Sequence, residues 1–401
     1  MAVSTPVTRT QVPDGVRDRL PSEAAAMRRL SARLDNVFRA WGYREVSTPV
    51  IEYLEAVAAG AANWGRREDL YQFFDRKGRT LALRPDMTTP IARLMATRLA
   101  DEPLPLRLSY FAPVFRHREL RAGATSEIWQ AGVELVGAPG EAADAEVISL
   151  ACAAVRAADL TGFRIGLGHV GVVEGLFESA GVDPQAAAVL KEAMVARDLV
   201  AFEQGVARAG LSGERAERLL ALVHFHGSYA EAVARFGGVR GRVAEALQHL
   251  GRVLEVLEAL GVAEQVNLDL GLVRSLGYYT GVVFEGYLPG IGAPVLGGGR
   301  YDNLVAEFGR PLAATGFALE VDRLLMAQEQ QGALAAEPGL DAVIACPPGQ
   351  EAAAMAWAAR LRAQGLAVEV DLLGRTGEEL AAYARARGAA RVLRPGVPSI
   401  H

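Results

Sequence analysis

The sequence predicts an α+β fold in which strands and helices build a main core, a helical segment is inserted, and a small α/β unit follows. Three observations support this class. Strand and helix patterns are interspersed up to about residue 183 and again after residue 262. The stretch between these two regions is almost purely helical. The last 61 residues alternate between strand and helix. At 401 residues the chain is long enough for two or three domains with sizeable cores.

Before the helical stretch, helices and strands follow one another irregularly. The first helix is expected over 22–40, where apolar residues recur on one face and Ser22 is the expected N-cap. Strands are expected at 43–50, 71–74, 80–83, 107–115, 128–136 and 163–167, and helices at 51–59, 90–100 and 143–158.

The helical stretch includes an apolar seam from Val243 to Leu260, whose members recur at spacings of four and three. This pattern favours the core of an inserted helical unit, with a partner-facing surface as the alternative. Beyond it we expect a Gly-rich turn at 297–299. Strands are expected at 266–270, 282–287, 315–318, 342–346, 367–371 and 390–393, and helices up to 330 and at 351–364 and 377–387.

Composition excludes several classes of protein. Hydrophobic residues make up 51% and charged residues 22%, which is typical of a folded chain and not of a disordered one. The formal charge of −5 gives no electrostatic support for wholesale nucleic-acid binding. The only two cysteines, Cys152 and Cys346, allow neither a disulfide framework nor a metal-ligand spacing. With no readable signal peptide and no long uncharged apolar run, we expect a cytoplasmic protein.

The first cluster with chemical potential is the segment 83–88, at the end of an expected strand. Asp86 and Thr88 could both accept hydrogen bonds from an ammonium group. The alternative is a strand-end turn whose polar side chains cap the following helix.

The second cluster pairs the segment 115–119 with the strand that returns after it. On that strand Gln130, Gly132 and Glu134 share one face because side chains alternate with a period of two. An amide and a carboxylate among apolar neighbours need partners if they are buried, and a polar ligand would supply them. The alternative is an exposed polar face on an edge strand.

Two further clusters follow the helical stretch. Arg274 could hold a carboxylate with two parallel hydrogen bonds, and a hydroxyl of Tyr278 or Tyr279 could orient a ring nitrogen. The alternative for these tyrosines is core packing. The glycines at 297–299, followed by Arg300, Tyr301 and Asp302, permit a tight turn or a close backbone approach.

The order and spacing of these clusters resemble the class II aminoacyl-tRNA synthetases, and specifically the histidyl branch, over about residues 10–330. The resemblance implies an antiparallel sheet flanked by helices in a core over 1–330, with the helical insertion at about 184–262. It also implies a linker at 331–340, a truncated anticodon-domain-like α/β unit at 341–401, and a homodimer formed through motif 1. The matching segments are YREVSTP (43–49) for motif 1, FRHRE (115–119) with QAGVELVG (130–137) for motif 2, TGFALEVDR (315–323) for motif 3, and RSLGYYTGVVFE (274–285) for the histidine pocket.

The same resemblance implies a role for each pocket residue. Asp86 and Thr88 would hold the α-ammonium group of histidine, and Arg274 would face its carboxylate. The other five would lie around these groups. Gln130 would face the ammonium or the carboxylate, with Arg116 nearby. Glu134 and Tyr279, with Tyr278 beside it, would recognise the imidazole ring.

The sequence departs from the synthetase pattern on the side that binds ATP. Arg118 stands where motif 2 normally has an acidic residue, and Glu119 is one step late. The arginine expected late in the motif 2 loop is replaced by Ala124-Thr125-Ser126, Gly277 replaces an aspartate, and Glu320 replaces a glycine before Asp322-Arg323. Losing basic side chains while gaining a carboxylate disfavours the binding of a polyanion such as ATP.

This combination resembles the histidyl-tRNA synthetase-like regulatory subunits of ATP phosphoribosyltransferase, as does the segment 165–171 (IGLGHVG). The resemblance implies no catalytic residues, no cofactor and no metal. It implies a partner, the short-form catalytic subunit that needs this chain for activity, and L-histidine as a feedback effector. Neither a membrane nor tRNA is an expected partner.

Two alternatives stay open. An active histidine–tRNA ligase would use ATP, Mg²⁺ and a tRNA-binding C-terminal domain, for which the arginines at 385, 387, 391 and 394 are a candidate phosphate contact or a solvated helix terminus. A scaffold protein could keep the fold without sensing histidine. A metal site at His224 and His226 is not expected, because a spacing of two in an expected helix does not place two ligands on one face.

Overall fold

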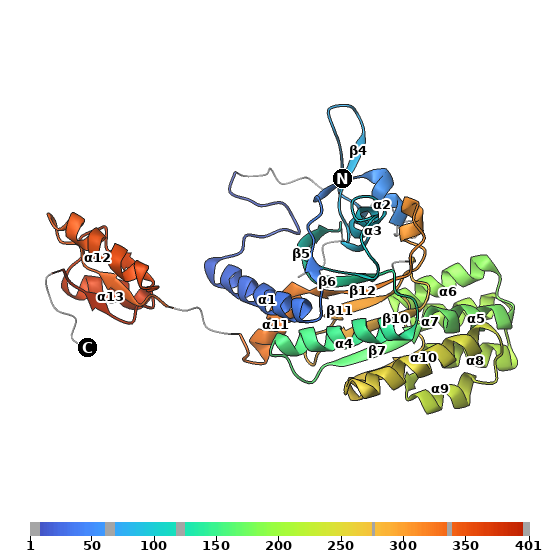
Figure 1. Ribbon diagram of the computed structural model, residues 1–401. Helices are drawn as coiled ribbons and strands as arrows, with labels where there is room; N and C mark the ends of the chain where they lie inside the picture. Colours follow the sequence, from blue (N-terminus) through green and yellow to red (C-terminus); the bar gives the residue numbers. More distant parts are fainter. Residues whose placement is uncertain (1–8, 61–68, 118–124, 275–276, 335–338, 396–401) are drawn as a thin grey trace, which may run out of the picture. The chain divides into compact units, whose positions relative to one another are not determined.

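The computed structural model describes residues 9–60, 69–117, 125–274, 277–334 and 339–395. The chain divides into two compact units, residues 1–334 and residues 335–401 (Figure 1). Each unit has a hydrophobic core of its own.

The first unit is built on a nine-stranded sheet. Its five central pairings are antiparallel, and parallel pairing occurs only at β1·β5 and β7·β9. The expected antiparallel sheet flanked by helices is therefore confirmed. In spatial order the strands are β1 (Arg44–Glu45), β5 (Leu106–Phe115), β6 (Glu127–Val136), β12 (Ala314–Glu320), β11 (Leu296–Arg300), β10 (Val282–Tyr287), β7 (Arg164–His169), β9 (Val266–Asp269) and β8 (His226–Gly227).

Helices cover both faces of this sheet, and the alternation of β6 divides its side chains between them (Figure 1). Ala131, Val133 and Leu135 pack into the core formed with α1 (Pro21–Ala40), α4 (Glu141–Ala157) and α11 (Val321–Gln330). Residues of β6 at even positions face the other core, which contains α3 (Thr88–Ala96) and η3 (Val305–Phe308). Gln130 and Glu134 therefore lie on the α3 side.

A run of helices follows β7: α5 comes before the stretch at 184–262, and the run of helices expected within that stretch is confirmed. Its longest helix, α10, packs against α4 and α5, and it buries Val243, Leu250 and Leu257 completely. The seam is therefore core from Val243 to Leu257, with Leu254 partly buried, whereas Leu260 lies just beyond the helix and is 47% exposed. The helices are α5 (Val170–Ala180), α6 (Pro184–Ala196), α7 (Leu199–Arg208), α8 (Gly213–Val223), α9 (Tyr229–Phe236) and α10 (Arg242–Ala259), followed by η2 (Ala263–Gln265).

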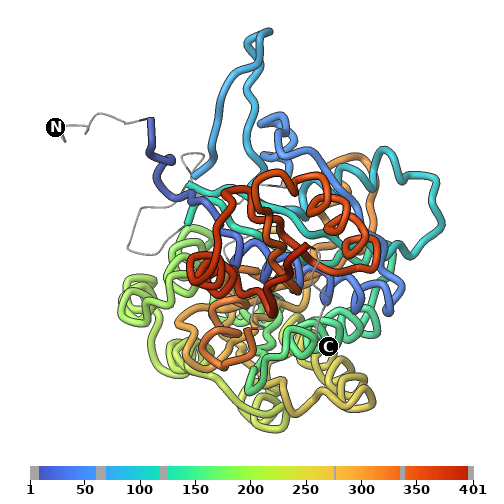
Figure 2. The backbone as a smooth tube through the Cα atoms, turned by 90° about the vertical axis from the view of Figure 1, so that its left-hand side faces the viewer, coloured from blue at the N-terminus to red at the C-terminus, as the bar shows by residue number. Residues whose placement is uncertain are grey.

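A small antiparallel sheet stands beside the main one. It has the order β2 (Ile51–Tyr53), β4 (Thr80–Leu83) and β3 (Gln72–Phe74), and α2 (Leu54–Gly60) follows β2. The β3–β4 hairpin projects away from the rest of the unit in both views (Figures 1 and 2). Phe74 on this hairpin is 73% exposed.

The second unit has a three-stranded parallel sheet with the order β14-β13-β15. Its strands alternate with helices along the chain, as the sequence pattern predicts. The elements are β13 (Ala342–Ile344), α12 (Glu351–Ala363), β14 (Val368–Val370), α13 (Gly377–Ala386) and β15 (Val392–Leu393).

Local expectations near the N-terminus are wrong in three places. Helix α1 begins at Pro21, with Leu20 and not Ser22 at the N-cap, because a proline in the first turn already has the backbone angle a helix needs. The expected helix at 51–59 starts only at Leu54, because 51–53 pairs with β4 as a strand. The strand expected over 43–50 is reduced to β1, Arg44–Glu45.

Two further corrections concern later segments. The glycines at 297–299 lie in strand β11 and not in a turn. His226 lies in the short strand β8, and His224 stands at the C-cap of α8, so the two are not in a continuous helix. The pairing of β11 with β10 and β12 explains the first difference, and the pairing of β8 with β9 explains the second. A single sequence does not show such pairing.

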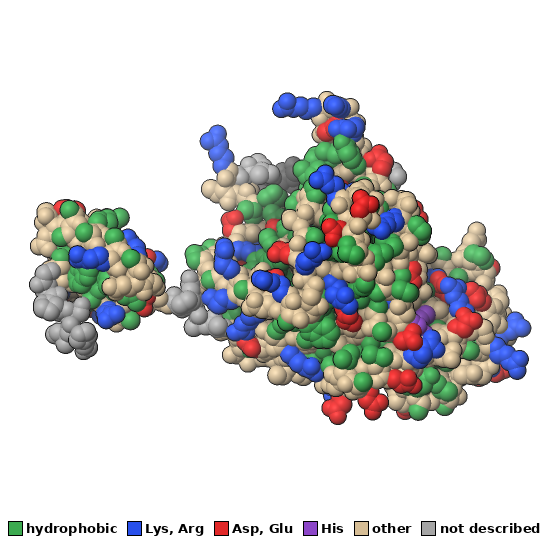
Figure 3. Space-filling model, viewed as in Figure 1, with side chains coloured by type: hydrophobic (Ala, Val, Ile, Leu, Met, Phe, Trp, Pro, Cys, Tyr) green, Lys and Arg blue, Asp and Glu red, His purple; other side chains and the backbone are tan. Residues whose placement is uncertain are grey.

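Surface charge is mixed on the face of the first unit that Figure 3 shows, where basic and acidic side chains are interspersed. No helix among the described residues is long and apolar enough to span a bilayer.

Candidate functional site

Glu134 is the centre of the candidate site. It is 1% exposed, on the α3 side of the sheet. One carboxylate oxygen accepts a hydrogen bond from Thr88 Oγ1 at 2.8 Å, and the other accepts a short one from the Tyr301 hydroxyl. The carboxylate therefore joins the start of α3 to the end of β11.

Glycines on the neighbouring strand and on β6 itself make room for this carboxylate. Gly316 lies opposite Glu134 in the β6–β12 register, and a Cβ at this position would collide with Glu134 Oε2. A Cβ at Gly132 would collide with the Tyr110 hydroxyl. The pocket floor therefore depends on the absence of side chains at these two positions.

The turn at 84–88 is fixed from behind by Arg84, which is 3% exposed. Its guanidinium donates to the carbonyl oxygen of Thr48 at 2.7 Å and to that of Pro113 at 2.9 Å. Thr48 of the motif 1-like segment and Pro113 of β5 thereby hold the turn in place. Asp86 is two residues after Arg84.

Asp86 caps the beginning of α3. Its carboxylate accepts from the backbone N–H of Thr89 at 2.7 Å and from the Thr89 hydroxyl at 3.2 Å. The capping interpretation of this segment is therefore confirmed. It does not exclude a ligand, because two carboxylate oxygens together offer about four lone pairs.

Three tyrosines form an aromatic wall beside Glu134. The ring centroids of Tyr278 and Tyr279 are 4.8 Å apart, and those of Tyr278 and Tyr301 are 5.6 Å apart. Tyr278 and Tyr279 are partly exposed, so they line an opening and are not simply core residues. The structure thus brings Thr88, Glu134 and the tyrosine pair together.

Arg274 lies flat against the sheet at the other end of this wall. Its Nη1 donates to Glu285 Oε1 at 2.9 Å, whereas its Nε is buried without a hydrogen-bond partner among the described residues. The side chain fits there because position 297 on β11 is glycine, whose Cβ would collide with the guanidinium.

Gln130 and Arg116 are less tightly joined to the others. Arg116 Nε donates to the carbonyl oxygen of Pro85 at 2.8 Å, which links the end of β5 to the turn that contains Asp86. Gln130 is 5% exposed and shares a face of β6 with Glu134, but no hydrogen bond joins it to another predicted residue among those described. The edge-strand alternative is wrong, because β6 lies between β5 and β12.

Burial strongly affects the charge of the central carboxyl. The pKa of Glu134 is raised from 4.5 to about 8, mainly because the carboxyl is removed from water. The hydrogen bonds from Tyr301 and Thr88 act in the opposite direction, and the nearby charge of Asp86 contributes to the rise. A cationic ligand group at this position would favour the ionised carboxylate. With Arg274 at the opposite end, the site suits a ligand that is positively charged at one end and negatively charged at the other.

The motif 3-like segment is engaged in contacts within the chain. Arg323 Nη1 lies 2.9 Å from Glu320 Oε2 and also donates to the carbonyl oxygen of Pro294. Asp322 pairs with Arg19 at 2.8 Å and with Arg17 at 3.2 Å. The cation of this segment is therefore already neutralised by Glu320.

The motif 2-like loop is only partly described. The departures at Arg118, Glu119 and Ala124 lie outside the described residues. Ser126, where the description resumes, donates its backbone N–H to the carbonyl oxygen of Gly15 at 2.7 Å, so the N-terminal segment lies against the end of this loop.

Two members of the site, Tyr301 and Glu285, are not among the predicted site residues. Tyr301 directly follows the glycine cluster, and expecting a turn there hid the fact that β11 aims this residue at Glu134. Glu285 ends the segment that resembles the histidine pocket, but only strand pairing places it beside Arg274.

The comparisons agree with this architecture. The family model described as Histidyl-tRNA synthetase matches residues 15–324, which is most of the first unit. Fold and site together define a class II aminoacyl-tRNA synthetase-like protein of the histidyl branch.

Relatives narrow this class further. The chain is 99% identical over 399 residues to the ATP phosphoribosyltransferase regulatory subunit of Symbiobacterium thermophilum, covering 100% of both chains. It is 48% identical to that of Moorella thermoacetica, covering 94% of this chain and 96% of the relative. A crystal structure from Bacillus halodurans, described as an ATP phosphoribosyltransferase regulatory subunit/histidyl-tRNA synthetase, superposes with a TM-score of 0.86 at 34% identity, covering 97% and 99% of the two chains. The chain belongs to the family of ATP phosphoribosyltransferase regulatory subunits.

Proposed function

We propose that this chain assembles with a short-form ATP phosphoribosyltransferase catalytic subunit in the cytoplasm, is required for its activity, and mediates feedback inhibition by L-histidine. The observation that carries the proposal is a difference between the pocket around Glu134 and the motif 3-like segment of the same unit. The pocket around Glu134 keeps groups for both ends of an amino acid, whereas the arginine of the motif 3-like segment is tied to Glu320.

The pocket offers a partner for each part of histidine. In this proposal Asp86 and Thr88 bind the α-ammonium group, and Arg274 binds the α-carboxylate. Glu134 and the tyrosine pair bind the imidazole ring, whose two nitrogens can both donate when it is protonated. The buried Nε of Arg274, which has no partner among the described residues, supports a ligand carboxylate at this point.

The alternative of an active histidine–tRNA ligase is less well supported. Adenylation needs basic side chains that are free to meet the phosphates of ATP, and Arg323 is neutralised by Glu320 at 2.9 Å. In the second unit Arg387 Nε lies 3.1 Å from Glu369 Oε2, and Arg385 pairs with Glu378. These two arginines are thus engaged in ion pairs and not held ready for tRNA phosphates.

The regulation needs no chemistry on this chain. Histidine must bind one state of the complex more tightly than another, and the ratio of the two affinities sets how far activity falls.

A coupled assay tests the proposal directly. Formation of phosphoribosyl-ATP by a short-form catalytic subunit is measured alone, with this chain, and with this chain plus L-histidine. We expect activation by the chain and reversal by histidine. No activation, or activation that histidine leaves intact, would contradict the proposal.

Two variants on opposite faces of β6 assign the effect to the pocket. Glu134→Gln should abolish inhibition and leave activation intact, whereas Glu127→Gln should behave as the wild type because that residue faces away from the pocket. Histidine-dependent ATP–pyrophosphate exchange is the complementary measurement, and a positive result there would favour the ligase.

We also infer a homodimeric core formed through the motif 1 region. The exposed apolar side chains of Ile51, Tyr53 and Phe74, which lie on the small sheet that follows this segment, support the inference. Light scattering of the isolated chain tests it, and a monomer at micromolar concentration would contradict it.

A further inference from the structure

Glu285 on β10 holds one arginine on each of its carboxylate oxygens. Its Oε1 accepts from Arg274 Nη1 at 2.9 Å, and its Oε2 accepts from Arg197 Nη2 at 3.0 Å. The first arginine belongs to the pocket described above, and the second belongs to the helical insertion. A single carboxylate, 13% exposed, thus bridges the two parts of the unit.

The sheet around Glu285 is shaped for this bridge. In the strand register Glu285 lies between Gly297 of β11 and Gly166 of β7. A Cβ at Gly297 would collide with the Arg274 guanidinium, and one at Gly166 would lie 3.4 Å from the Cβ of Asp269. Glycine at position 297 therefore lets Arg274 lie flat beside the carboxylate, whereas the space at Gly166 would accept a Cβ in ordinary contact with Asp269.

Arg197 stands at the joint between α6 and α7, which consists of Arg197 and Asp198. Arg197 adopts a left-handed conformation with φ 53°, which is uncommon for a residue with a Cβ and persists where surrounding contacts hold it. Asp198 caps α7 by accepting from the backbone N–H of Ala201 at 2.8 Å. A displacement of Arg197 would therefore reach both helices.

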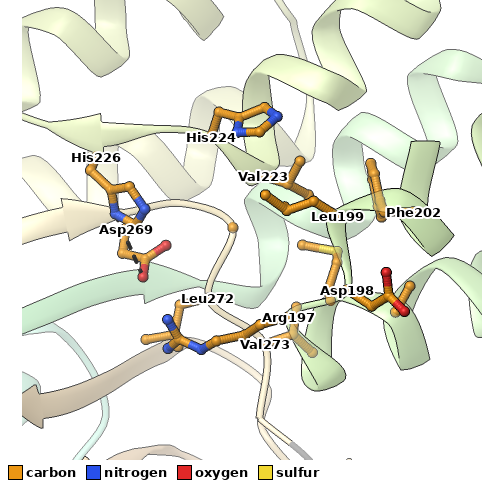
Figure 4. Close-up of a pocket in the computed structure, with 13 residues that line it drawn as sticks. Arg197, Asp198, Leu199, Phe202, Val223, His224, His226, Asp269, Leu272 and Val273 are labelled. Atoms are coloured by element: carbon orange, nitrogen blue, oxygen red, sulfur yellow. Dashed lines mark ion pairs between the residues drawn. The ribbon is translucent and has the colours of Figure 1, made fainter. Parts of the chain in front are cut away.

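The joint also forms one wall of a pocket of about 220 Å³ between the insertion and the segment that follows β9. In Figure 4 the Arg197 side chain crosses this pocket toward Leu272, and Asp269 and His226 lie on the opposite side. His226 Nδ1 is 3.8 Å from Asp269 Oδ2. The pocket gives Arg197 space to rearrange, and Asp269, which also lines it, is a second carboxylate near the arginine.

We propose that the chain Arg274–Glu285–Arg197 transmits occupancy of the Glu134 pocket to the α6–α7 joint. The proposal rests on the function proposed above and names the route of regulation from that site. The α-carboxylate of histidine adds a negative charge beside Arg274 and competes with Glu285 for the same guanidinium. Glu285 then shifts its hydrogen bonding toward Arg197 and Tyr287, which already donates to Oε2, and the joint is held more tightly against the sheet.

Competition of this kind follows from the donor geometry of arginine. A guanidinium has five N–H donors in a rigid fork, so Arg274 can meet a second carboxylate through Nε while Nη1 still faces Glu285. Two carboxylates on one cation repel each other, and Glu285 has an alternative partner in Arg197. The weaker contact is therefore the one between Arg274 and Glu285.

Hydrogen–deuterium exchange of the full chain, with and without L-histidine, tests the route, and calorimetry measures histidine binding in parallel. In the wild type we expect histidine to slow exchange of the amides at 194–202 by about threefold, the size of effect a partly exposed ion pair supports. Arg197→Met should abolish this change. Because coupling between two sites acts equally in both directions, the histidine Kd of Arg197→Met should differ from that of the wild type by no more than about threefold.

Three further variants make the result specific. Arg197→Asn, which tolerates the left-handed conformation, should give the same loss if Arg197→Met folds poorly. Arg197→Lys should restore part of the response because it keeps the charge without the fork. Arg208→Met, at the exposed end of α7, should respond as the wild type does.

The outcomes separate this proposal from the previous one. Histidine binding with no change at the joint, or an unchanged response in Arg197→Met, overturns the transmission route and leaves the pocket assignment intact. No binding of histidine to the wild type overturns both.

Discussion

Replacing Glu134 by glutamine should change how the stability of this protein depends on pH. Burial raises the pKa of this carboxyl from 4.5 to about 8 in the folded chain. Between these two values the folded state holds a proton that the unfolded state has released. Folding stability therefore falls as pH rises through this window, and the contribution is fully present only below pH 4.5.

The magnitude follows from the two pKa values. Each pH unit between them is worth about 1.4 kcal/mol. From pH 5 to pH 8 the wild type should lose roughly 3 to 5 kcal/mol relative to Glu134→Gln, which has the same shape and no titrating proton. Urea unfolding of both proteins at half-unit pH steps measures the difference directly.

Glu146 provides a control of opposite sign. Although burial raises its pKa, hydrogen bonds from Arg107 and Tyr43 outweigh this and lower the pKa below 4.5. The contribution of Glu146 should therefore be constant above about pH 5 and disappear only in acid, so the difference between the wild type and Glu146→Gln stays flat from pH 5 to 8. Equal pH slopes for the wild type and Glu134→Gln would refute the assignment of a buried, protonated carboxyl at the pocket centre.

Three other substitutions have defined outcomes. Arg300→Met leaves the fully buried Asp144 without its arginine partner. In urea titrations it should lower the free energy of unfolding by about 3 to 5 kcal/mol, and a loss below about 1 kcal/mol would argue against a tight ion pair. Gly316→Ala places a Cβ against Glu134 Oε2. Calorimetry should then show histidine affinity reduced roughly tenfold or more with the fold retained. Unchanged affinity would mean that the ligand binds elsewhere. Leu250→Ala removes a fully buried side chain from α10 and should cost about 2 to 5 kcal/mol, whereas a near-neutral effect would mean that the insertion is loosely packed.

Local patterns in the sequence predict the class of fold, which the structure confirms, and the residue types of the candidate pocket. Periodicity is local information, so the long strands β5, β6 and β10 and the helices of the insertion could be placed within a few residues. The motif-like segments supplied Asp86, Thr88, Glu134 and the tyrosine pair, because their spacing is preserved within short stretches of chain.

Only the tertiary structure decided which groups meet. Tyr301 donates to Glu134 across a separation of 167 residues. Glu285 connects Arg274 to Arg197, and Arg197 precedes Glu285 by 88 residues in the chain. Such contacts depend on strand order and register, which are set by the packing of the whole sheet and not by any local pattern. For the same reason the glycine run at 297–299 predicts a turn, although it lies in a strand, where the missing side chain at Gly297 allows Arg274 to lie flat beside Glu285.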